Sequence, residues 1–156
     1  MSKGKELGVY GEQLVVRHCS CPRCKRSKTL KALPQNFKRA DVICDFCGYL
    51  GQVKTANVSD VTSIPSQILG AAWHPQKERM DAGIYFPLFL VLIDSWGKNT
   101  IYYLSGDVQS PDIFKPRKPL SETARRAGWQ GFIYDLSKIR NAFVRVYPRM
   151  PSTKCL

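Results

Sequence analysis

Residues 40–55 read ADVICDFCGYLGQVKT, and they place a Cys-x-x-Cys-Gly turn between an aspartate and a Gln-x-Lys sequence. Apolar and aromatic residues stand on both sides of this turn, as in the two arms of a β-hairpin. We expect strands over residues 40–44 and 49–55, with residues 45–48 at the tip. The register of this hairpin decides which polar side chains meet.

The symmetric register pairs Ile43 with Leu50 and, further from the tip, Asp41 with Gln52. Side chains directly opposite each other on an antiparallel pair share one face, with their Cβ atoms about 5 Å apart. Residues two apart along one strand also share a face, which adds Lys54. The register therefore predicts a cluster of Asp41, Gln52 and Lys54 on one face of the hairpin.

The cysteine spacing predicts a structural zinc site. Two Cys-x-x-Cys pairs, with nineteen residues between them, supply four thiolates for a tetrahedral Zn2+: Cys21, Cys24, Cys44 and Cys47. When sulfur fills all four positions, the ion has no open position for a substrate, so this zinc would be structural rather than catalytic. His18 and Cys19 are spare ligand candidates, and two unrelated free pairs or a redox pair are the alternatives.

Charge and length limit the class of protein. The chain has 156 residues, enough for one domain, and its 24 Lys and Arg against 12 acids give a net charge of +12. Such a surplus indicates a polyanionic partner, and nucleic acid is favoured over a membrane surface because no basic amphipathic helix stands out. No apolar signal segment follows the N-terminus, so we expect a cytoplasmic protein without disulfides.

The remaining sequence predicts a mixed α/β fold. Apolar residues at helical spacing predict a helix over residues 6–18, and a second helix is expected over residues 76–81. Residues 57–72 are interpreted as a loop followed by a helix. Loops are expected over residues 26–39 and 110–119, and further strands over residues 86–94, 100–104, 129–136 and 142–147.

The predicted cluster on the hairpin suits phosphodiester hydrolysis. An aspartate and a neighbouring carbonyl oxygen can hold Mg2+ or Mn2+, which polarises a phosphoryl oxygen and acidifies a bound water. A lysine beside the cation stabilises the charge of the transition state. Asp41, Gln52 and Lys54 resemble in this respect the active-site motif of the PD-(D/E)XK nuclease superfamily. The alternative is a solvated polar face without catalytic function.

A second segment carries a closer resemblance. Residues 117–137 read RKPLSETARRAGWQGFIYDLS, which resembles a segment of the DpnI family of methyl-directed restriction endonucleases. That family also has a Cys-Pro-x-Cys knuckle, an acid, a second knuckle and a Glu-x-Lys in the order found here. The resemblance implies a PD-(D/E)XK core, a mixed sheet flanked by helices, with a four-cysteine zinc ribbon within about residues 19–50. It also implies a bacterial or phage endonuclease that cuts double-stranded DNA at adenine-methylated GATC.

Two features depart from this family. Its glutamate is Gln52 here, which removes one negative charge from the site, and Glu12 on the N-terminal helix is the acid we expect to assist as a Mg2+ ligand. The longer enzyme also carries a C-terminal winged helix. We expect residues 1–156 to form a single nuclease domain without it.

The basic segment after residue 116 predicts DNA contacts. Positive side chains supply contacts to phosphates or guanine edges, and an aromatic ring supplies a surface for a base or a methyl group: Arg117, Lys118, Arg125, Arg126 and Trp129. The alternative is a solvated basic helix with Trp129 in the core.

Three functions remain open from the sequence. The first is a type II restriction-like endonuclease that acts as a homodimer or by successive nicks. The second is a non-catalytic zinc-ribbon protein that binds nucleic acid and whose Gln52 marks a decayed site. The third is an RNA-binding or RNA-processing ribbon protein.

Overall fold

The computed structural model describes residues 3–35, 37, 40–116 and 129–150, and it describes the backbone but not the side chains of residues 71–77 and 129–131. The helices are α1 (Lys3–His18) and α2 (His74–Asp81). The strands are β1 (Leu30–Ala32), β2 (Val42–Cys44), β3 (Leu50–Asn57), β4 (Gln67–Trp73), β5 (Leu88–Ile93), β6 (Asn99–Leu104), β7 (Phe114–Pro116), β8 (Trp129–Asp135) and β9 (Val144–Tyr147). Short 3-10 helices span Gly106–Val108, Pro111–Ile113 and Arg140–Ala142.

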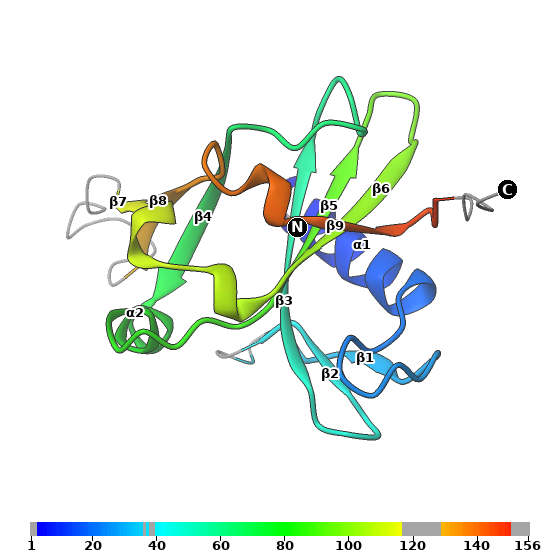
Figure 1. The fold of residues 1–156 in the computed structure, drawn as a ribbon, viewed down its shortest axis with the longest axis horizontal. Coiled ribbons are helices and arrows are strands. Elements are labelled where there is room, and N and C mark those ends of the chain that lie inside the picture. Colours follow the sequence, from blue (N-terminus) through cyan, green and yellow to red (C-terminus); the bar gives the residue numbers. More distant parts are fainter. Residues whose placement is uncertain (1–2, 36, 38–39, 117–128, 151–156) are drawn as a thin grey trace, which may run out of the picture.

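A six-stranded mixed sheet forms the centre of the fold (Figure 1), with the strand order β1-β2-β3-β5-β6-β9. Strands β3 and β5 are parallel, and the other neighbouring pairs are antiparallel. Strand β5 reads LFLVLI and is buried along its whole length. A continuous apolar run of this kind is expected for a strand that is covered on both faces.

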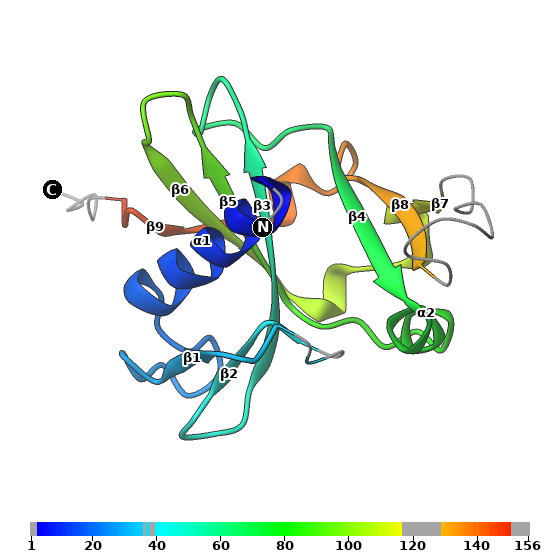
Figure 2. The same cartoon turned by 180° about the vertical axis from the view of Figure 1, so that it is seen from behind.

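Helix α1 covers one face of this sheet, as Figure 2 shows from behind. Leu14 and Val15 of the helix pack with Phe89 and Val91 of β5 and with Ile101 of β6. The hydrophobic spacing that predicted this helix is therefore the stripe that faces the core. The same core includes cysteines of the ribbon, so the zinc site and the helix share one set of packed residues.

A three-stranded sheet with the order β4-β8-β7 covers the opposite face. Leu90 and Leu92, which point away from α1, pack with Phe132 and Tyr134 of β8. The predicted α/β fold with a mixed sheet and flanking helices is thus confirmed, and a second small sheet adds to it. In the described part of the chain, no helix has the length and apolar character needed to cross a bilayer.

Three segments differ from the sequence prediction. The helix expected before residue 72 is wrong, because Gln67–Trp73 forms strand β4 along β8. The loop expected over residues 26–39 contains β1, and the loop expected over residues 110–119 contains a 3-10 turn and the short edge strand β7. Their tertiary partners, rather than local propensity, decide these elements.

Candidate functional site

The four cysteines of the two knuckles come together as predicted. The Sγ atoms of Cys21, Cys24, Cys44 and Cys47 all lie within 4.8 Å of one another. The Cys21–Cys47 and Cys24–Cys44 pairs are 3.6 and 3.7 Å apart. Four sulfurs at the usual Zn–S length of about 2.3 Å would be separated by about 3.8 Å on a tetrahedron. These thiols are therefore positioned to hold a metal such as zinc, and they are too far apart to be disulfides.

The two knuckles use the same backbone turn. The N–H of Lys25 donates to the carbonyl of Cys21, and the N–H of Gly48 donates to the carbonyl of Cys44, each at 2.9 Å. Both residues have a left-handed backbone, with φ of 63° at Lys25 and 75° at Gly48. Glycine adopts this conformation freely, whereas for a residue with a side chain it costs about 1–2 kcal/mol. The first knuckle thus has Lys25 at the left-handed position, where the second knuckle has Gly48, which adopts that backbone conformation without strain.

Local hydrogen bonds favour the thiolate of Cys44. Burial raises the pKa of this thiol. Hydrogen bonds oppose burial, and they involve the Thr29 hydroxyl, 3.3 Å away, and the backbone N–H groups of Cys47 and Phe46. Together they outweigh burial and lower the pKa to about 6. The spare candidates lie apart from this cluster. Cys19 is buried outside the group of four, and the ring of His18 stacks on Tyr147 with centroids 3.9 Å apart.

The hairpin has two pairs of the predicted register, and the ladder ends before the predicted Asp41–Gln52 pair. Val42 pairs with Gly51 and Ile43 with Leu50. Asp41 directly precedes β2, and its N–H donates to the carbonyl of Gly51 at 3.0 Å. Its Oδ2 accepts the N–H of Val53 at 2.8 Å. If β2 were longer, its backbone would accept the Val53 N–H, but here the Asp41 carboxylate accepts it instead. The carboxylate is thereby fixed beside the strand that carries Gln52 and Lys54.

Glu12 on α1 lies in the electrostatic field of the same site. Burial raises the pKa of its carboxyl from 4.5 to about 7, the Asp41 carboxylate contributes to this rise, and Lys54 opposes both. Charges influence a pKa in this way only at short range. Glu12 of α1 therefore responds to the charges of Asp41 and Lys54, and its role as a Mg2+ ligand stays a prediction.

Close packing of α1 on β3 sets the position of this acid. A Cβ atom added at Gly11 would stand 1.8 Å from Oγ1 and 3.0 Å from Cβ of Thr55. No side chain fits between helix and strand at this point, so the backbone of α1 lies directly against Thr55. Sequence analysis missed this contact, because a glycine before Glu12 carries no sign of the partner it meets.

Gln52 occupies the wall of a small pocket between β3 and the α2 region. Its backbone N–H donates to the carbonyl of Pro87 at 2.8 Å and so joins β3 to the start of β5. The other residues that line the pocket are Arg79, Met80, Ile84, Tyr85, Phe86, Gln109 and Phe114. Gln52 is half-buried at this wall.

The second sheet also approaches the site. Tyr134 on β8 is buried, and its pKa is raised by burial and also by the charge of Asp41. The sequence offered no signal for this neighbour, because β8 and the hairpin are distant in the chain.

Four of the predicted DNA-binding residues, Arg117, Lys118, Arg125 and Arg126, lie outside the described residues. Trp129 begins β8, where its backbone pairs with Trp73.

The sequence model of the family described as DpnI, Dam-replacing family, matches residues 1–147. One solved structure, described as a restriction endonuclease in complex with substrate DNA, is similar over 91% of this chain and 82% of that chain, with 16% sequence identity and a TM-score of 0.45. Because the family match spans nearly the whole sequence, the chain belongs to the DpnI, Dam-replacing family of restriction-type nucleases.

Proposed function

We propose that residues 1–156 form one nuclease domain that hydrolyses phosphodiester bonds of double-stranded DNA with a divalent cation, Mg2+ or Mn2+. The observation that carries this proposal is the convergence of Asp41, Glu12 and Lys54. The two acids and the lysine come from α1, the residue before β2, and β3, and the pKa of Glu12, raised by burial and by Asp41 and lowered by Lys54, supports their proximity.

The donor set fits a hard divalent cation. Two neighbouring carboxylates repel each other, and the raised pKa of Glu12 is in part a result of this repulsion. A cation between them would remove the repulsion, and carboxylate and amide oxygens are ligands that Mg2+ accepts. We assign Asp41, Glu12 and the amide oxygen of Gln52 as its ligands. Bound there, the cation would polarise a phosphoryl oxygen and lower the pKa of a water.

The remaining residues of the site have positioning and electrostatic roles. Asp41 is held by the N–H of Val53, so its carboxylate does not need to be ordered when DNA binds. Lys54 presents a positive charge where negative charge develops on the phosphate, and it can orient the attacking water. Gln52 supplies an uncharged oxygen, so we expect the site to need a higher Mg2+ concentration than a site with glutamate would.

Adenine-methylated GATC is the target that we propose from family membership. Arg117, Lys118, Arg125 and Arg126 would contact phosphates or guanine edges, and Trp129 would contact a base or its methyl group. A zinc ion on the four cysteines would hold the hairpin tip, which helps to fix the register of Asp41 against β3.

Gln52 also supports a second candidate, a non-catalytic protein that binds DNA through a decayed site. The two candidates are separated by incubating the protein and Mg2+ with the same plasmid in adenine-methylated and unmethylated form. The nuclease predicts nicked or linear product from methylated plasmid. Binding to plasmid without any cut in Mg2+ or Mn2+ would favour the decayed site. Linear product at the first detectable cut would indicate two active sites acting together, and nicked product would indicate successive cuts.

A further inference from the structure

The zinc ribbon carries a group of cations that the proposed active site does not use. Residues 21–31 include five basic side chains and no acid: Arg23, Lys25, Arg26, Lys28 and Lys31. All five are exposed. We call these five residues the basic ribbon cluster. Around the second knuckle, Asp45 is the one acid among residues 42–50. Within the part of the chain that the structure describes, none of the five forms an ion pair.

Two arginines of the cluster are held by aromatic rings. The guanidinium of Arg26 lies 3.7 Å from the centroid of the Phe46 ring, and that of Arg23 lies 5.2 Å from the centroid of the Tyr49 ring. Phe46 is 58% exposed, so this ring serves as a platform at the surface rather than as core. Contact with a ring face fixes a guanidinium without using its N–H donors, which remain free for an anionic ligand.

The lysines at positions 25 and 28 occupy strained positions. Lys25 has a left-handed backbone at the same point of its knuckle where Gly48 stands in the other, and Lys28 is left-handed as well, with φ of 60°. Backbone bonds fix this loop, because the N–H of Cys21 donates to the carbonyl of Arg26 at 3.0 Å. A lysine in place of glycine opposes stability at such a site.

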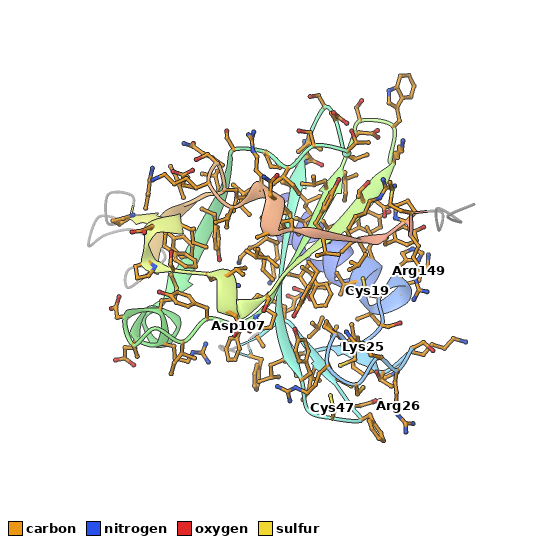
Figure 3. All side chains as sticks on the ribbon, viewed as in Figure 1. Cys19, Lys25, Arg26, Cys47, Asp107 and Arg149 are labelled. Carbon is orange, nitrogen blue, oxygen red and sulfur yellow. The ribbon has the colours of Figure 1, made fainter. Side chains whose placement is uncertain are left out.

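The cluster lies at a fixed distance from the proposed active site, because the ribbon holds it against the tip of the catalytic hairpin. Figure 3 shows Lys25 and Arg26 beside Cys47 at the ribbon end of the molecule. Phe46 at the tip stands five positions after Asp41, and because only Val42–Cys44 of this segment are strand, the separation is at most about 16 Å. One turn of B-DNA rises about 34 Å over about 10 base pairs, so this distance corresponds to at most about 5 base pairs.

We propose that the basic ribbon cluster binds the phosphate backbone of the same duplex that the active site cuts, about 5 base pairs from the cleaved bond. The inference rests on the proposed function, because DNA at Asp41 sets the direction of the duplex. It adds a second DNA-binding surface on the ribbon to the segment around residues 117–129. Zinc then has two consequences, since it fixes both the catalytic hairpin and the residues that bind phosphate.

The test compares two duplexes that contain one methylated GATC site, in zinc-containing buffer without added Mg2+. The long duplex has about 12 base pairs on each side of the site, and the short duplex has about 2, too few to reach the ribbon. The first variant is Arg23→Gln/Arg26→Gln. For each phosphate that it no longer neutralises, it should bind the long duplex roughly eightfold more weakly than wild type at 0.1 M salt, with a salt slope smaller by about 0.9. On the short duplex, the variant and wild type should bind equally.

Lys25→Gly separates charge from structure. It removes one charge and relieves the left-handed strain, so its melting temperature should equal or exceed that of wild type while its affinity for the long duplex falls. Lys98→Gln is the matched control, because Lys98 is exposed on the β5–β6 turn at the opposite end of the sheet from the ribbon. It should leave both affinities unchanged.

Several outcomes would overturn the ribbon proposal. They are equal binding of the long duplex by wild type and the arginine variant, an equal decrease on both duplex lengths, or a decrease for Lys98→Gln as large as that for Lys25→Gly. Tighter binding of RNA than of the long duplex, with the same arginine dependence, would also overturn it. Plasmid cleavage reports separately on the active site. If wild type cuts plasmid but the arginine variant binds the long duplex as tightly as wild type, the nuclease proposal is supported and the ribbon proposal is refuted. If wild type does not cut but the arginine variant binds the long duplex more weakly, the ribbon proposal is supported and the nuclease proposal is refuted.

Discussion

Asp41 Oδ2 accepts a 2.8 Å hydrogen bond from the backbone N–H of Val53, the residue between Gln52 and Lys54. This bond ties the acid from one arm of the hairpin to the strand that bears the amide and the lysine. Helix α1 brings Glu12 to the same place, as the influence of Asp41 and Lys54 on its pKa indicates. The proposed chemistry therefore depends on two features, the hairpin register and the packing of α1 on β3.

The packing of α1 on β3 should be sensitive to one methyl group. Gly11→Ala places a Cβ against Thr55, and overpacking of this kind costs about 1–3 kcal/mol. Because the shift moves Glu12, we also expect a higher Mg2+ requirement for DNA cleavage. Gly8→Ala is the matched control, since nothing lies within 4 Å of a Cβ at Gly8, and it should stabilise the helix by up to about 1 kcal/mol.

A second substitution tests whether the contact with Thr55 is the cause. Thr55→Ala removes Oγ1, the atom nearest to the added Cβ. Gly11→Ala should therefore be less destabilising in a Thr55→Ala background, as measured by urea unfolding. Equal costs in both backgrounds would exclude this contact as the reason for glycine at position 11.

The raised pKa of Glu12 predicts a pH-dependent stability. Between its ordinary pKa of 4.5 and its folded pKa of about 7, the folded chain keeps a proton that the unfolded chain has released. The free energy of unfolding should therefore fall as the pH rises through this window. Allowing for partial exposure, we expect Glu12→Gln to gain about 1 kcal/mol relative to wild type at pH 8 and little at pH 4.5.

The check is urea unfolding of wild type and Glu12→Gln across this pH range, using the difference between the two proteins so that the titration of the zinc site cancels. Added Mg2+ should remove the difference at pH 8 by stabilising the wild type. A difference that is the same at every pH would contradict the assignment of the proton to Glu12.

The cysteine cluster predicts a structural metal. Cys47→Ser removes one of four sulfurs and should lower the zinc content and the melting temperature, by about 10 °C or more, because metal binding is coupled to folding. Cys19→Ser changes a buried cysteine outside the cluster and should keep its zinc. Elemental analysis of both variants gives the result. Well-folded wild type without zinc would refute the metal site.

The hairpin could be predicted from the sequence because its information is local. A four-residue turn over residues 45–48, closed by Cys44 and Tyr49, leaves one symmetric register, and the start of that hairpin arm places Asp41 beside β3. The helix before the first knuckle was predictable for a similar reason, since its apolar stripe has helical spacing.

Strand β4 could not be predicted because its pattern is hidden. In a half-buried strand, apolar and polar residues alternate, but QILGAAW is apolar at nearly every position. Ile68 is buried while Leu69 is 69% exposed, so the alternation exists in burial and not in residue type. The approach of Tyr134 to Asp41 depends on this same sheet and was missed with it.

The most direct measurement of the central claim is a Mg2+ titration of DNA cleavage by wild type, Gln52→Glu, Asp41→Ala and Lys54→Ala on adenine-methylated plasmid. We expect wild type to cut, Gln52→Glu to cut at lower Mg2+ because a carboxylate replaces an amide, and Lys54→Ala to be severely slowed. Asp41→Ala should bind DNA without cutting it. If wild type and Gln52→Glu are both inert on methylated and unmethylated DNA, with zinc bound and the fold intact, the nuclease assignment is contradicted.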